Sequence, residues 1–142
     1  MPGDSHDYVL EGFAVPGGLD HVHALLERAG AEHPEIDPTD LMLFETAVIE
    51  IANNVVEHGR PEGEVRWRLT LRVGENEIEA ELVDSGQEFT PRLGADMPAA
   101  SAESGRGLPM AEAVLDRMEL TRVDTANRWH MLRRLSRPRG VE

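Results

Sequence analysis

Residues 38–58 read PTDLMLFETAVIEIANNVVEH, and this stretch decides the fold. Asp37 and Pro38 suit the N-cap and the first turn of a helix. Gly59 and Pro61 are typical of the residues that follow a helix end. Apolar residues recur at the spacing of one helix face, at Leu41, Phe44, Val48, Ile51 and Val55. The stretch therefore predicts a long amphipathic helix whose apolar stripe packs on another layer.

That second layer is predicted by the segments on either side. Residues 64–73 and 77–83 alternate apolar and polar side chains around the turn Gly74-Glu75-Asn76, as strands with one buried and one wet face do. Weaker patterns predict helices over 19–33 and 108–115 and strands over 7–15, 118–123 and 128–135, with a turn at 124–127. We expect an α+β two-layer sandwich, in which helices pack on one face of a mixed, mostly antiparallel sheet.

The chain has 142 residues, which suits one domain over 1–142 with its core at about 8–135. Residues 84–105 have little periodicity and are expected to form a loop, and residues 136–142 a frayed tail. There is no membrane-length apolar run and no signal-peptide pattern, so we expect a cytoplasmic protein without membrane contact.

Composition excludes several classes of function. The net charge is −13, which disfavours direct nucleic acid binding. Cysteine is absent, which excludes disulfides, thiolate metal sites and a cysteine nucleophile. All 14 basic residues are arginine, so P-loop, eukaryotic-type protein kinase and Schiff-base chemistry, which need lysine, are excluded as well.

Three polar residues of the long helix are candidates for a site. Glu50, Asn54 and His58 are spaced by four, and each step turns about 40° around a helix, so they share one flank. The amide oxygen of Asn54 suits a magnesium ion that keeps its waters and binds phosphate. The carboxylate of Glu50 suits a general base. On spacing alone, an ordinary solvated helix face is the commoner interpretation.

Two further segments carry chemistry that fits a nucleotide. Asp84 ends an alternating strand and can accept a hydrogen bond from an exocyclic amine such as that of adenine, while Gly86 leaves room for a flat ring. Residues 103–108 read ESGRGL before a helix, where Gly105 and Gly107 free backbone N–H groups for phosphate and Arg106 supplies positive charge. Taken singly, these are an ordinary turn and a flexible loop.

The three segments together resemble the GHKL ATPase superfamily and, more narrowly, the bacterial anti-sigma factor serine/threonine kinases. The resemblance rests on EIANNVVEHG at 50–59, VDSG at 83–86 and SGRGL at 104–108, and it spans about residues 9–135. It implies that Asn54 holds Mg²⁺ and that Glu50 is the general base. It also implies that ATP is bound by Asn54, Asp84, Gly86, Gly105, Arg106, Gly107 and Leu108.

The resemblance implies further that residues between Gly86 and Gly105 form an ATP lid. His58 fits the family pattern, and we expect it to be a helix-end cation with a packing role. Two departures stand out. Glu88 replaces the second glycine of the family's DxGxGF pattern and brings negative charge near a polyphosphate. The family's late threonine has only Thr125 and Asn127 as imperfect candidates.

The leading hypothesis is a Mg-ATP-binding anti-sigma factor-like serine/threonine protein kinase that acts in transcription regulation. It would phosphorylate an anti-sigma factor antagonist of the STAS type and sequester a sigma factor, and analogy with that group suggests a homodimer. The alternative is a GHKL-fold regulatory module that binds ATP weakly or not at all and acts by partner binding alone. The ATPase half of a histidine kinase is disfavoured, because no dimerisation helix with a phospho-accepting histidine precedes the domain.

Overall fold

The computed structural model describes residues 6–89 and 107–136. Most of the predicted lid, the candidate residues Gly105 and Arg106 and nearly all of the predicted tail lie outside the described residues. The described chain forms β1 (His6–Phe13), α1 (Gly18–Glu32), α2 (Pro38–His58), β2 (Arg66–Val73), β3 (Glu77–Asp84), α3 (Gly107–Val114), β4 (Arg117–Val123) and β5 (Ala126–Arg134).

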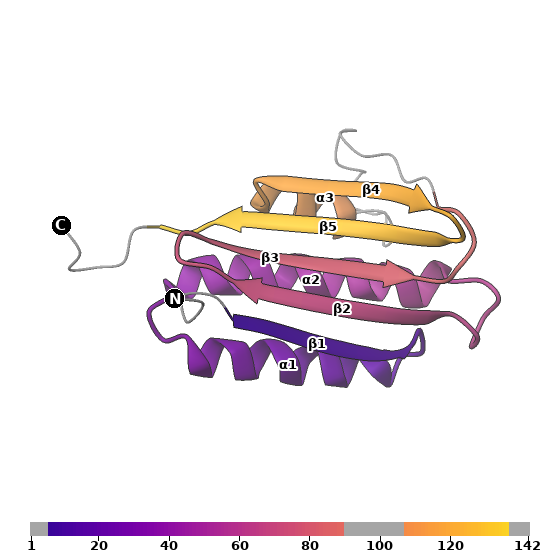
Figure 1. Ribbon diagram of the computed structural model, residues 1–142, viewed down its shortest axis with the longest axis horizontal. Coiled ribbons are helices and arrows are strands. Elements are labelled where there is room, and N and C mark those ends of the chain that lie inside the picture. The colour runs from indigo at the N-terminus through magenta and orange to yellow at the C-terminus, as the bar shows by residue number, and fades with distance from the viewer. Residues whose placement is uncertain (1–5, 90–106, 137–142) are drawn as a thin grey trace, which may run out of the picture.

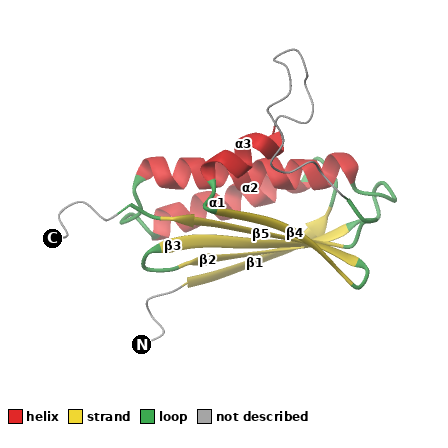
Figure 2. Cartoon of the chain, turned by 90° about the horizontal axis from the view of Figure 1, so that it is seen from above, coloured by secondary structure: helices red, strands yellow, loops and turns green. Residues whose placement is uncertain are grey.

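The strands form a five-stranded sheet in the order β1-β2-β3-β5-β4. Every pairing among these strands is antiparallel. The three helices lie on one face of the sheet (Figures 1 and 2), which confirms the predicted α+β sandwich. None of the described helices is long and apolar enough to cross a membrane.

The core lies between α2 and the sheet. Asp37 caps α2 as predicted, because its Oδ1 accepts a hydrogen bond of 2.8 Å from the N–H of Thr39. The stripe of α2 is buried at Phe44, Val48, Ile51 and Val55, and alternate residues of the central strands are buried at Trp67, Leu69, Leu71, Val73, Ile78, Ala80 and Leu82. These alternating side chains fill the space beneath the helix. The apolar stripe of α2 and the apolar face of the central strands therefore form one core.

The opposite face of the sheet is solvent-exposed and carries ion pairs between neighbouring strands. Arg68 meets Glu11 at 3.2 Å, and Arg72 meets Asp7 at 3.2 Å. Arg128 meets Glu81 at 2.6 Å. Cross-strand pairs of opposite charge support the strand register. They also offset the negative charge of the paired carboxylates on this face.

The last hairpin differs from its predicted form. Only Asp124 and Thr125 form its turn, since Val123 already pairs with Ala126. Asp124 adopts a φ of 55°, a left-handed conformation that aspartate tolerates and that lets the chain reverse in two residues. Because β5 begins at Ala126 rather than 128, Asn127 is part of a strand and lies directly opposite Asp84 of β3.

A buried ion pair joins the start of α2 to the end of the chain's last strand. Asp40 is 3% exposed, and its Oδ1 accepts hydrogen bonds from Arg133 Nε at 3.0 Å and Nη2 at 2.8 Å. Its Oδ2 accepts from the N–H of Ser136 at 2.7 Å. Arg133 also donates to the carbonyl oxygen of Val114 at the end of α3. One carboxylate thus holds three parts of the fold together.

The charge of Asp40 is stabilised by these donors. Burial by itself raises the pKa of this carboxyl, but the hydrogen bonds from Ser136 and Arg133 outweigh that effect and lower the pKa below its ordinary value. Folding therefore favours the ionised form. The associated stability is present above the unfolded-state pKa of about 3.9 and is lost as pH falls through the folded-state pKa.

We predict that Asp40→Ala lowers the free energy of unfolding by about 3–5 kcal/mol at pH 7, because it leaves the Arg133 guanidinium without its partner. Urea unfolding measures the loss, with Glu75→Ala on an exposed turn as the control. The stability gap between wild type and Asp40→Asn should narrow as pH drops below about 4. A difference in unfolding free energy that stays constant down to the pH of acid unfolding would contradict an ionised Asp40–Arg133 pair.

Candidate functional site

The carboxylate of Asp84 is a buried, hydrogen-bonded group at the end of β3. Asp84 is 4% exposed, and its Oδ1 accepts hydrogen bonds from the N–H of Gly86 and from Asn127 Nδ2, both at 2.9 Å. Its Oδ2 accepts from Trp129 Nε1 at 3.3 Å. A carboxylate has about four acceptor positions. Within the described chain three are filled, which leaves one on Oδ2 for an incoming donor.

Asn127 holds this carboxylate in place. Its second amide proton reaches the carbonyl oxygen of Gln87 at 2.9 Å, and its Oδ1 accepts from Arg122 Nη1 at 3.0 Å. Arg122 Nη1 also donates to the carbonyl oxygen of Gly86 at 2.7 Å. Every polar atom of the Asn127 side chain is thus engaged, so the loop after β3 is fastened to the β4–β5 hairpin.

Gly86 leaves room for the Asp84 carboxylate because it has no side chain. A Cβ at this position would lie 3.1 Å from Asp84 Oδ1 and 3.3 Å from Val65 Cγ2, which are both tight contacts. The expected role of Gly86 was to leave room for a flat ring. Here the space that it leaves accommodates Asp84 and Val65.

Asn54 and Asp84 line the same cavity. His58, Phe89, Asn127 and Trp129 also contribute to its wall. The cavity has a volume of about 10 Å³, which is room for about one water molecule. A purine ring is many times larger, so a base can enter next to Asp84 only if a neighbouring side chain moves outward.

Phe89 is a partly buried side chain in the wall of this cavity. Its ring stacks on His58 with centroids 5.2 Å apart and an interplanar angle of 19°, and it lies 5.9 Å from the ring of Trp129. His58 Nε2 in turn lies 3.0 Å from Glu57 Oε1. The expectation that His58 packs at the helix end is confirmed by this stack, which holds Phe89 against the cavity.

Glu50 lies one turn before Asn54 but faces a different neighbour. A Cβ on Gly107 would collide with Glu50 Oε2, so the carboxylate lies directly against the first residue of α3. Leu108 is buried and anchors α3 on α2. The helix start that is expected to face phosphate is therefore next to the candidate base, and a side chain at position 107 would require the Glu50 carboxylate to shift.

The donor set is compatible with Mg²⁺ brought in by a nucleotide. Within residues 6–89 and 107–136 no cluster of three or more His, Cys, Asp or Glu side chains could hold a metal alone. The expected magnesium ligand Asn54 is a single neutral oxygen donor beside the Asp84 cavity. Mg²⁺ commonly keeps several waters and binds through one or two protein oxygens plus phosphate, so one amide is a sufficient protein contribution.

Sequence reasoning missed part of this site. In the sequence, Asn127 and Thr125 are the two candidates for the position of the family's late threonine. In the structure Asn127 donates a hydrogen bond to Asp84, whereas Thr125 is exposed in the turn. Arg122, Trp129 and Phe89 were not singled out. The pairing of residues 77–83 with the last strand was the available signal, because it sets the side chains that lie opposite the end of β3.

Comparison with known proteins identifies the class. Residues 14–132 match the family described as the histidine kinase-like ATPase domain, and the chain belongs to that family. The predicted resemblance to GHKL-type ATPases is thereby confirmed. A comparison with curated proteins found no match.

Among solved structures, a similar one is the crystal structure of the RsbU and RsbW domains of Rv1364c from Mycobacterium tuberculosis. The TM-score is 0.66 at 24% sequence identity, and the similarity covers 94% of this chain and 33% of that one. The two proteins share a fold over nearly all of this chain, which spans a third of the length of its counterpart.

We predict that Asn127→Ala weakens Mg-ATP binding about tenfold, because Asp84 loses the donor that orients it and a net hydrogen bond is worth about 1 kcal/mol or somewhat more next to a charge. Isothermal titration calorimetry provides the measurement. Thr125→Ala is the matched control, since it removes the other candidate two residues away. Equal losses in both variants would show that Asn127 does not hold Asp84.

Proposed function

We propose that this protein is an anti-sigma factor-like serine/threonine kinase that binds Mg-ATP and phosphorylates an anti-sigma factor antagonist of the STAS type. In its other state it sequesters a sigma factor and so regulates transcription. The observation that carries the proposal is the position of Glu50, whose carboxylate lies against the first residue of α3 and one helical turn from Asn54. Pure nucleotide binding does not require a carboxylate at that place.

The proposal gives each residue a distinct task. Asp84 accepts a hydrogen bond from the adenine amine through its remaining Oδ2 position, and Asn54 contributes the protein ligand to Mg²⁺. Gly105, Arg106, Gly107 and Leu108 bind the phosphates at the start of α3. The N-terminus of a helix favours anions through its free N–H groups and its dipole.

The chemistry at Glu50 is a proton transfer coupled to phosphoryl transfer. ATP supplies the γ-phosphoryl group, and ADP leaves with the electrons of the broken P–O bond. The serine or threonine oxygen forms the new bond to phosphorus, and Glu50 accepts the proton of that hydroxyl. A positioned general base contributes about 10²–10⁴ in rate.

The acidic chain favours protein partners over nucleic acid. Its net charge of −13 repels phosphate backbones, so we propose that it acts on transcription through the sigma factor without touching DNA. A homodimer in the cytoplasm is the assembly that we propose by analogy with the anti-sigma factor kinases.

We predict that Glu50→Ala lowers phosphate transfer to the antagonist about 10²–10⁴-fold while Mg-ATP still binds. Incubation with γ-labelled ATP and candidate STAS-type antagonists gives the rate, and calorimetry gives the affinity. Glu62→Ala, at an exposed glutamate outside α2, is the control. If the wild-type protein binds ATP but transfers phosphate to no antagonist, the kinase assignment is wrong.

A second candidate function is a regulatory module that acts by partner binding alone. Two observations favour it. Glu88 is exposed on the loop next to the nucleotide cavity and adds negative charge there, and that cavity admits about one water. The charge works against the polyphosphate of a nucleotide, and the small cavity works against its base.

We predict that Glu88→Gln tightens Mg-ATP binding about two- to fivefold, since the substitution removes one exposed like charge worth about 0.5–1 kcal/mol. Calorimetric titration at low salt, where surface charges act most strongly, measures the change. Glu75→Gln makes the same charge change on a distant turn. If wild type and Glu88→Gln both fail to bind at millimolar nucleotide, the module without ATP is the better assignment.

A further inference from the structure

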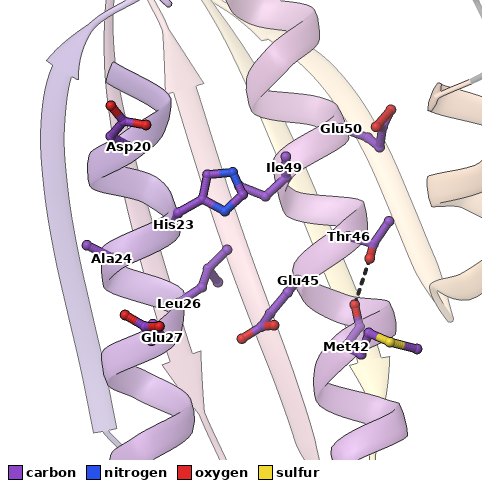
Figure 3. Close-up of a pocket in the computed structure, with 10 residues that line it drawn as sticks. All are labelled: Asp20, His23, Ala24, Leu26, Glu27, Met42, Glu45, Thr46, Ile49 and Glu50. Atoms are coloured by element: carbon purple, nitrogen blue, oxygen red, sulfur yellow. Dashed lines mark hydrogen bonds between the residues drawn. The ribbon is translucent and has the colours of Figure 1, made fainter. Parts of the chain in front are cut away.

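A second, larger cavity lies on the helical layer between α1 and α2. Its volume is about 570 Å³, which is room for several side chains of an extended segment. Figure 3 shows α1 and α2 side by side, with His23 and Glu27 on one helix and Glu45 and Ile49 on the other. We call it the acidic cleft.

The charged side chains of the acidic cleft are mainly acidic, and His23 is the basic side chain in its described lining. Four carboxylates line it, from Asp20, Glu27, Glu45 and Glu50, and its described lining contains no arginine. None of the salt bridges among the described residues includes any of these four. The sheet face is different, because carboxylates there meet arginines across the strands. The cleft therefore holds negative charge that no salt bridge among the described residues compensates.

The environment of Glu45 points to a cation as well. Burial raises the pKa of this carboxyl, and the nearby charge of Glu27 raises it further, while His23 lowers it. A cationic side chain placed between α1 and α2 would lower the pKa of Glu45 again, because a nearby opposite charge favours the ionised carboxylate.

The cleft also has an apolar component. Leu26 and Ile49 are among its lining residues, and Met42 beside them is 57% exposed. An exposed methionine is an adaptable contact for the carbon stems of long side chains. Glu50, the same carboxylate that lies against Gly107, also lines the cleft. Its side chain points to the side of α2 away from α1 (Figure 3).

We propose that the acidic cleft docks a basic segment of the partner protein, namely the arginine- or lysine-bearing stretch that flanks its phospho-accepting serine or threonine. Such a segment pairs its cations with Glu27 and Glu45 and delivers the hydroxyl to Glu50. The inference rests on the proposed kinase function for the role of Glu50. Recognition of a basic segment follows from the cleft itself.

The docking test uses the full chain without nucleotide, so its outcome is independent of ATP binding. The probes are a fluorescent peptide with one serine between arginines and the same peptide with glutamates in place of the arginines. Fluorescence anisotropy at near-physiological salt gives both affinities. We expect the arginine peptide to bind and the glutamate peptide not to bind.

The matched variants locate the binding. Glu27→Gln/Glu45→Gln should weaken the arginine peptide about five- to tenfold, while Glu62→Gln/Glu75→Gln, which changes net charge equally on exposed sites elsewhere, should not. Circular dichroism verifies that both double variants are folded. Equal weakening in both, or no binding of the arginine peptide at millimolar concentration, would overturn the proposal.

Phosphate transfer adds a second readout. The Glu27→Gln/Glu45→Gln variant should raise KM for the antagonist with little change in kcat, because docking and chemistry are separate. An unchanged KM would contradict docking in the cleft even if transfer occurs. The opposite outcome is a protein that transfers no phosphate but binds the peptide through Glu27 and Glu45. It would support docking in the acidic cleft and contradict the proposed kinase function.

Discussion

The burial of one face of α2 against the sheet is the constraint on which the rest of the structure depends. Phe44, Val48, Ile51 and Val55 are each at most 4% exposed. Burying such a side chain is worth about 1.5–3 kcal/mol, so a rotation of the helix that exposed them would be very unfavourable. The orientation of α2 is therefore set by its apolar side chains, and its polar residues take the positions that remain.

Glu50, Asn54 and His58 look equivalent in the sequence, but their positions on α2 give them different neighbours. Glu50 faces the start of α3 and also lines the acidic cleft, whereas Asn54 faces the cavity of Asp84. His58, at the end of the helix, stacks on Phe89. A spacing of four places all three on one flank, but α3 covers only part of that flank. What each residue can do follows from the element that packs next to it.

Much of the fold could be predicted, because it depends on local periodicity. The stripe of α2 and the alternation in β2 and β3 specify which faces meet, and the cap at Asp37 marks the helix start. The network around Asp84 was less accessible. It requires Asn127 to belong to β5, and the two-residue turn that places it there depends on the left-handed conformation of Asp124. The buried pair of Asp40 with Arg133 joins residues far apart in the chain, and no local pattern indicates it.

The central claim is that the Asp84 cavity is an adenine site that opens when Phe89 moves. Calorimetric titration with Mg-ATP and Mg-ADP, in wild type and in Asp84→Asn, tests it most directly. The account predicts saturable binding of both nucleotides to wild type and a large loss in Asp84→Asn, whose amide presents fewer acceptor positions to the network and to the base. Absence of binding at millimolar nucleotide, or equal binding by both proteins, would contradict it.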